Sequence, residues 1–81
     1  MRVTVCFYSY FKDMAGCAQT LETLPDGCTL DALFDTLAVR FPKLAAARKS
    51  ALMAVGVDYQ PRKHVLRDGD EVSLFPPVQG G

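Results

Sequence analysis

A single amphipathic helix is the feature of this sequence that most restricts how it can fold. Apolar residues recur at helical spacing over one long stretch, at Leu30, Leu33, Phe34, Leu37, Ala38 and Phe41. The pattern predicts a helix with one apolar stripe, begun by Thr29 as its N-cap and stopped by Pro42. Because one helix covers only one face of a sheet, the other apolar residues have to assemble against that stripe.

Segments with the alternation or the apolar content of β-strands lie on both sides of this helix. They span residues 2–8, 18–24, 52–57 and 71–75. In the first segment, Val3, Val5 and Phe7 fall on one face and the intervening residues fall on the other. The order strand, strand, helix, strand, strand predicts an α+β fold, in which a mixed sheet packs one face against the helix.

The opposite face of that sheet should carry aromatic side chains. If the apolar residues of the last strand face the helix, Phe75 lies on the uncovered face, and Tyr8 takes the matching position on the first strand. Tyr59, in or beside a turn that we expect at residues 58–61, can join them. Large apolar side chains rimmed by polar residues are typical of protein interfaces, although scattered exposed aromatics are also common. We predict that Tyr8, Tyr59 and Phe75 contact a protein partner.

The last strand leads into an unusual segment, Pro76-Pro77-Val78-Gln79-Gly80-Gly81. Proline cannot continue a central sheet ladder, so Pro76 and Pro77 should end the strand and favour an extended exit. Glycine adds no side-chain width, so Gly80 and Gly81 can enter a slot too narrow for other residues. We therefore expect a domain over residues 1–75 and an extended C-terminal tail over residues 76–81. A merely disordered terminus is the plain alternative.

Length and charge limit the class of protein. The chain has 81 residues, of which 49% are hydrophobic, and this predicts one folded domain. Its nine basic and nine acidic residues cancel, which argues against nucleic acid as the main partner. No apolar stretch approaches the roughly 18 residues of a membrane span, and Met1-Arg2 leads directly into a strand pattern. We therefore expect a cytoplasmic protein that does not bind a membrane.

The charges are unevenly distributed along the chain. Basic residues dominate residues 40–67, whereas acidic residues dominate the segments before and after them. Solvated surface charge is the simpler explanation, and a charged docking face is the alternative.

The cysteines and the single histidine form no recognisable motif. Cys6, Cys17 and Cys28 have spacings that match neither a zinc site, nor a thioredoxin motif, nor a disulfide framework. His64 has no neighbouring cysteine or second histidine with which to share a metal. We expect no bound metal or cofactor and no catalytic side chain on this chain. An independent enzyme with a cysteine nucleophile is disfavoured, because only one histidine is present to activate a thiol.

Three stretches together resemble a known family. They are residues 5–16, residues 29–42, and residues 66–81 with their Asp68-Gly69-Asp70-Glu71-Val72, Phe75-Pro76-Pro77-Val78 and Gly80-Gly81. This pattern is similar to the MoaD-type sulfur carriers, the small subunits of molybdopterin synthase, which are related to the thiazole sulfur carrier and to ubiquitin. The resemblance covers essentially the whole chain, and its closing motif is specific. It implies a β-grasp, ubiquitin-like fold.

The resemblance also implies a role for the tail. An E1-like adenylating enzyme would consume ATP to adenylate the carboxylate of Gly81. A sulfurtransferase or cysteine desulfurase would then supply the sulfur that converts it to a thiocarboxylate. In the heterotetrameric synthase, Pro76, Pro77, Val78, Gln79 and Gly80 would thread into the large subunit, where sulfur passes to cyclic pyranopterin monophosphate. This chain would then be a sulfur-carrying subunit of a transferase whose active site lies on the large subunit.

Two other functions would use the same tail. One is a sulfur carrier for thiazole or cysteine synthesis, and the other is a ubiquitin-like modifier that forms isopeptide bonds with lysines. The length of the chain and the approach through Phe75, Pro76 and Pro77 favour the molybdopterin pathway.

Overall fold

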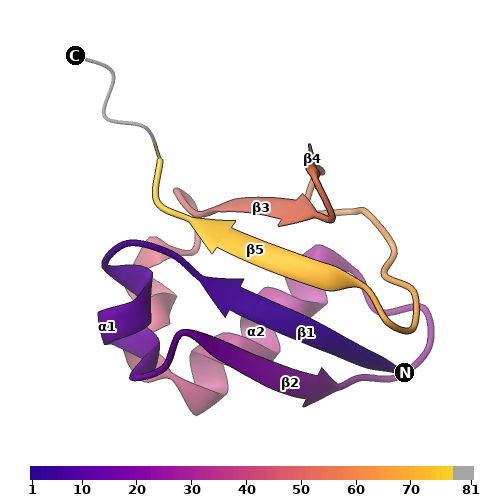
Figure 1. Cartoon of the computed structure of the whole chain (residues 1–81), viewed down its shortest axis with the longest axis horizontal. Coiled ribbons are helices and arrows are strands. Elements are labelled where there is room, and N and C mark those ends of the chain that lie inside the picture. Colours follow the sequence, from indigo (N-terminus) through magenta and orange to yellow (C-terminus); the bar gives the residue numbers. More distant parts are fainter. Residues whose placement is uncertain (78–81) are drawn as a thin grey trace.

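The computed structural model describes residues 1–77 as a five-stranded sheet with one long helix packed against it (Figure 1). The strands are β1 (Arg2–Phe7), β2 (Gln19–Thr23), β3 (Leu52–Val55), β4 (Asp58–Tyr59) and β5 (Glu71–Phe75). The helices are α1 (Phe11–Ala15), the long α2 (Leu30–Arg40) and the 3-10 helix η1 (Pro42–Ala47). The order of elements confirms the predicted α+β class, and the arrangement is the β-grasp fold that the resemblance implied.

The first and last strands are neighbours in the centre of the sheet. The spatial order is β2-β1-β5-β3-β4, in which β1 and β5 run parallel and every other pair runs antiparallel. The register sets Val5 beside Val72 and Phe7 beside Leu74, so these four side chains share one face. That face is turned toward α2, as predicted.

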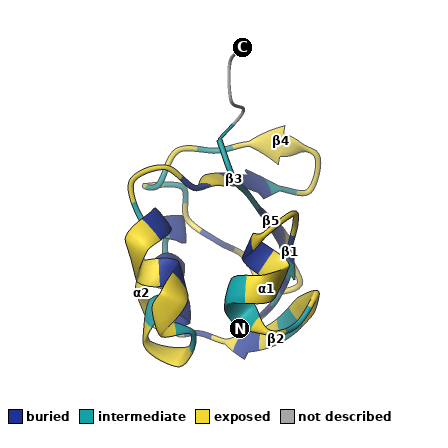
Figure 2. Ribbon diagram, turned by 90° about the vertical axis from the view of Figure 1, so that its left-hand side faces the viewer, coloured by how far each residue is buried: buried dark blue, intermediate teal, exposed yellow. Residues whose placement is uncertain are grey.

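Helix α2 closes this face because its sequence fixes both its beginning and its buried side. The hydroxyl of Thr29 accepts a hydrogen bond from the amide of Ala32, which makes Thr29 the predicted N-cap. The residues Leu30, Leu33, Phe34 and Leu37 are fully buried. They form the core together with the inner face of the sheet, while the outer side of α2 stays exposed (Figure 2).

Several predicted boundaries were wrong. The residues expected to form a turn at 58–61 include strand β4, and the turn lies at residues 56–57, where the predicted third strand should have continued. Gly56 has a positive φ of 62°, which allows the tight reversal. The segment after α2 is a 3-10 helix that begins at Pro42, the residue predicted to stop α2.

Residues 78–81 lie outside the described part of the chain, so the predicted tail is described only at Pro76 and Pro77. Among residues 1–77, no helix has the length and apolar character needed to cross a membrane.

Candidate functional site

Three aromatic side chains, two from strands and one directly after a strand, meet on the uncovered face of the sheet. Tyr8 directly follows β1, Phe75 ends β5, and Tyr59 lies in β4. The rings of Tyr8 and Phe75 are stacked, with centroids 4.6 Å apart and planes 11° apart. Tyr59 meets Phe75 edge-on, with centroids 6.0 Å apart. Tyr8, Tyr59 and Phe75 are called the aromatic cluster below.

The aromatic cluster is open to solvent at its edges and closed at its centre. Tyr8 is 42% exposed and Tyr59 65% exposed, whereas Phe75 is half-buried. We expected an open ring at Phe75, but Tyr8 stacks on it and covers part of its surface. Leu52, which is paired with Phe75 in the β3–β5 register, is 37% exposed and extends the apolar surface. The face therefore presents a contiguous apolar patch around a partly covered phenyl ring.

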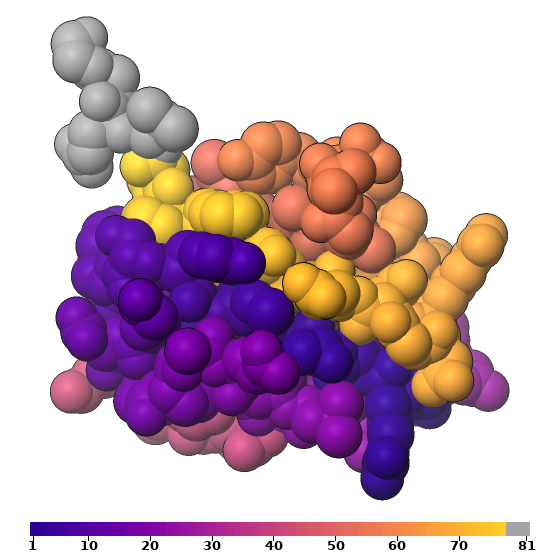
Figure 3. Space-filling model, in the orientation of Figure 1, coloured from indigo at the N-terminus to yellow at the C-terminus, as the bar shows by residue number. Residues whose placement is uncertain are grey.

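The root of the tail lies at one end of this patch. Pro76 follows Phe75 directly, and Pro76 and Pro77 are both half-buried and belong to no strand. In Figure 3 the last yellow residues lie between the indigo β1 segment and the orange β3–β4 segment. The structure therefore brings Tyr8, Tyr59, Phe75 and the start of the tail together. The predicted tail residues Val78, Gln79, Gly80 and Gly81 lie outside the described residues.

The uncovered face also carries a small polar region beside the aromatic cluster. Cys6 of β1 lies between Gln19 and Glu71, with its Sγ 4.0 Å from the Gln19 Oε1 and 3.9 Å from the Glu71 Oε1. Burial raises the pKa of the Cys6 thiol, and the charge of Glu71 and its hydrogen bond raise it further. Burial also raises the pKa of Cys28, which lies in the core. Both thiols therefore favour the protonated, weakly nucleophilic form.

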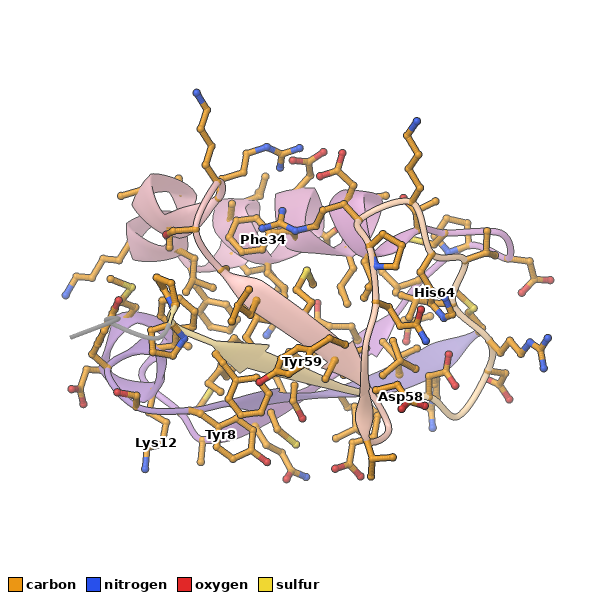
Figure 4. The ribbon with its side chains drawn as sticks, turned by 90° about the horizontal axis from the view of Figure 1, so that it is seen from above. Tyr8, Lys12, Phe34, Asp58, Tyr59 and His64 are labelled. Atoms are coloured by element: carbon orange, nitrogen blue, oxygen red, sulfur yellow. The ribbon has the colours of Figure 1, made fainter. Side chains whose placement is uncertain are left out.

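Two arginines of the basic segment, Arg48 and Arg62, form ion pairs within the chain. Arg48 pairs with Asp31 and Asp35 of α2, and Arg62 lies within 3.8 Å of Asp31 and over the ring of Phe34. Figure 4 shows Phe34 on the helix side of the sheet, opposite Tyr8 and Tyr59. These contacts explain part of the uneven charge distribution, because they join the acidic side chains of α2 to two arginines that follow it in the sequence.

Sequence reasoning missed an ion pair in which the carboxylate is buried and the guanidinium is half exposed. Glu22 of β2 is only 4% exposed, because the register places it beside Val3 on the inner face. Its carboxylate pairs with the guanidinium of Arg40 at the end of α2 and accepts a hydrogen bond from the Thr20 hydroxyl. The alternation of β2 was the available signal, since it places residues 20, 22 and 24 on one side.

Residues 1–77 contain no cluster of three or more His, Cys, Asp or Glu side chains arranged to hold a metal ion. His64, half-buried in the loop before β5, donates its backbone amide to the carbonyl of Pro61, and its own carbonyl accepts from the amide of Leu30 (Figure 4).

Comparison with known proteins places this chain in a family. The ThiS family model matches residues 5–81. The molybdopterin synthase sulfur carrier subunit of Escherichia coli is 35% identical over 98% of this chain and 99% of its own length. The corresponding subunit of Chlamydomonas reinhardtii is 30% identical over the full length of both chains.

Solved structures agree on the fold. A putative molybdopterin converting factor subunit 1 from Pyrococcus furiosus superimposes with a TM-score of 0.86 at 26% identity, over 96% of this chain and 99% of that one. A chain from the complex of subunits 1 and 2 of the molybdopterin-converting factor of Helicobacter pylori gives a TM-score of 0.69 at 24% identity, over the full length of both. The match over residues 5–81 and the full-length relatives show that this chain belongs to the ThiS family of sulfur carriers, together with the molybdopterin synthase sulfur carrier subunits.

Proposed function

We propose that this chain is the sulfur carrier subunit of a molybdopterin synthase and that it carries sulfur as a thiocarboxylate on Gly81. The full-length similarity to proteins named as sulfur carrier subunits is the observation that carries the proposal. The geometry supports it, because the chain leaves the central strand of the sheet directly beside an apolar patch. Such an arrangement lets a partner hold the domain while it receives the tail.

The proposed chemistry takes place in three steps at the Gly81 carboxyl group. A carboxylate is a poor electrophile, so an oxygen of Gly81 first attacks the α-phosphorus of ATP, and pyrophosphate leaves. A persulfide held by a sulfurtransferase or cysteine desulfurase then attacks the acyl carbon and displaces AMP, which gives an acyl disulfide. Finally a thiol reductant attacks the donor's sulfur in this acyl disulfide, forms a disulfide with the donor and releases the thiocarboxylate, which is a soft nucleophile at neutral pH. The activating enzyme supplies the binding site for ATP.

In the proposed synthase the thiocarboxylate sulfur attacks a carbon of the precursor, cyclic pyranopterin monophosphate, in a pocket of the large subunit and displaces an oxygen leaving group from that carbon. Water then hydrolyses the acyl–sulfur bond, which leaves the sulfur on the precursor and returns Gly81 to its carboxylate form. Two sulfur atoms are needed to build the dithiolene, so two carriers or two rounds of loading are required. Acid and base groups come from the large subunit. The side chains of this carrier bind the large subunit and position the tail.

The aromatic cluster is the proposed docking surface for the large subunit. A few central aromatic residues commonly dominate the affinity of a protein interface, and the stacked pair of Tyr8 and Phe75 has this character. The Helicobacter pylori structure contains both subunits of its converting factor, which supports a complex of the same kind for this chain.

The first experiment tests the chemistry. The chain is incubated with the activating enzyme, ATP and a sulfur donor, and its intact mass is measured. The expected product is heavier by the difference between one sulfur and one oxygen atom, and a chain without Gly81 should show no such product. Two results would exclude the Gly81 carboxyl group as the carrier of the sulfur. One is a thiocarboxylate on the truncated chain, and the other is no thiocarboxylate on the intact chain under conditions that load a known carrier.

The second experiment tests docking by titrating the carrier into the large subunit in a calorimeter. Phe75→Ala should weaken binding by about 2 kcal/mol, roughly thirtyfold in Kd, because it removes the centre of the aromatic cluster. Tyr10→Ala is the matched control, since Tyr10 is 46% exposed but packs edge-on against Phe11 and lies outside the cluster. Equal affinities for the two variants would place the docking surface elsewhere.

A further inference from the structure

The tip of the β3–β4 hairpin carries an apolar side chain that the described fold leaves in solvent. The two strands are joined by Gly56 and Val57, and the pair Val55–Asp58 closes the turn. Gly56 has a positive φ and Val57 does not, which is the pattern of a type II′ turn. This turn needs glycine at its first central position, but its second position accepts the small polar residues that are common in turns. Turn geometry therefore does not require valine at position 57.

Packing within residues 1–77 gives Val57 no role either. Its side chain is 96% exposed, more than any other large hydrophobic residue of the described chain. A valine in water forgoes the stabilisation that its burial would bring. The described residues therefore give this apolar group neither a turn requirement nor a packing partner.

The hairpin projects toward the side of the sheet that bears the aromatic cluster. In Figure 4, β4 extends away from α2, toward the side on which Tyr8 lies, and Tyr59 points back from the hairpin toward the cluster. Tyr59 contacts Phe75, and it stands only two residues from Val57. The hairpin therefore projects on the side of the sheet that bears the apolar patch and carries Val57 at its turn, with the exposed Asp58 between Val57 and Tyr59.

We propose that Val57 is a second apolar anchor, which inserts into an apolar depression of the large subunit next to the surface that receives the aromatic cluster. The inference rests on the proposed function for the identity of the partner. It adds a contact that the aromatic cluster alone does not supply. The cluster offers a surface whose central residue, Phe75, is partly buried, whereas the hairpin tip offers a protruding group that selects for a complementary hollow.

The test compares two exposed valines on opposite sides of the molecule. Val57→Ser is measured against Val39→Ser, because Val39 is 81% exposed on α2, on the far side of the sheet. We expect Val57→Ser to weaken calorimetric binding to the large subunit about tenfold, as the loss of a buried valine would. Val39→Ser should leave the affinity unchanged, and both variants should melt at the temperature of the parent chain.

Val57→Thr separates side-chain burial from the geometry of the turn. Threonine keeps the β-branched shape and replaces one methyl by a hydroxyl, so this variant should also weaken binding while preserving the hairpin. Unchanged affinity for both Val57 variants, with Phe75→Ala still weakened, would overturn this inference and leave the proposed docking surface standing. If Phe75→Ala also bound normally, the docking surface itself would be wrong. Equal losses for Val39→Ser and Val57→Ser would overturn the inference too.

Discussion

The two faces of the sheet use apolar side chains for different purposes. On the face toward α2, the side chains of Val5, Phe7 and Val72 are at most 1% exposed, and the chain buries them itself. On the other face, Tyr8 is 42% exposed and Tyr59 is 65% exposed. Both of their rings contact the ring of Phe75. The difference teaches that hydrophobic content alone does not identify a core. What matters is whether another element of the chain covers the residue.

The largest effect should come from the covered face. Phe34 is fully buried on α2, and the guanidinium of Arg62 lies 5.2 Å from its ring centroid. Phe34→Ala should lower the free energy of unfolding by about 3–5 kcal/mol, because it removes a buried ring and leaves a cavity. Urea unfolding followed by circular dichroism measures this loss. A loss below about 1 kcal/mol would mean that the covered face is not the core.

A smaller loss is expected at the edge of the same face, where Arg40 neutralises Glu22. Arg40→Ala should cost about 1–3 kcal/mol of unfolding free energy, since it leaves a buried carboxylate with only the Thr20 hydroxyl as partner. Asp35→Ala is the matched control. Asp35 pairs with Arg48 but is 64% exposed, and such surface pairs contribute about 1 kcal/mol or less. Equal costs in urea unfolding would show that burial of Glu22 does not matter.

The uncovered face should contribute little to the stability of the monomer. Tyr59→Ala removes an edge-on aromatic contact from a residue that is mostly in solvent, so we expect a loss of about 0.5–1 kcal/mol. The same urea titration measures it. If the loss approached that of Phe34→Ala, the contrast between the two faces would fail, and Tyr59 would belong to a second core.

The smallest effect concerns the reactivity of Cys6. Glu71 raises the pKa of the Cys6 thiol, so Glu71→Gln should lower that pKa and increase the thiolate fraction at any pH below it. Alkylation of Cys6 by iodoacetamide, followed by peptide mass spectrometry, should therefore become faster. Cys28 is the internal control, because burial alone raises its pKa. An unchanged Cys6 rate would mean that burial alone raises the pKa of this thiol and that Glu71 adds nothing to it.

The sequence was sufficient for the elements whose signals are local and repeated. The stripe from Leu30 to Phe41 and the cap at Thr29 predicted α2, and the alternation in the first and last strands assigned the right face to Val5, Val72 and Phe75. These features depend on helical or strand periodicity, which the sequence displays directly.

Very short elements and contacts between residues distant in the sequence could not be predicted from such periodic patterns. Strand β4 has only two residues, too few for any period, and Asp58 resembles a turn residue as much as a strand residue. The pairing of Glu22 with Arg40 joins residues 18 positions apart, and the stacking of Tyr8 on Phe75 requires the parallel register of β1 and β5. From the sequence, Phe75 could be assigned to the face of the sheet opposite α2. The extent to which the Tyr8 ring covers it could not be predicted.

The central position of β5 has a mechanical consequence. This strand is hydrogen-bonded to β1 on one side and to β3 on the other, and it is the strand from which the chain continues through Pro76. Because β1 and β5 are parallel, tension between the beginning of β1 and the end of β5 acts along both strands in opposite directions (Figure 1). Their hydrogen bonds are then loaded together in shear instead of one after another. A partner that pulls on this end of the chain while the beginning of β1 is held therefore has to break these hydrogen bonds together.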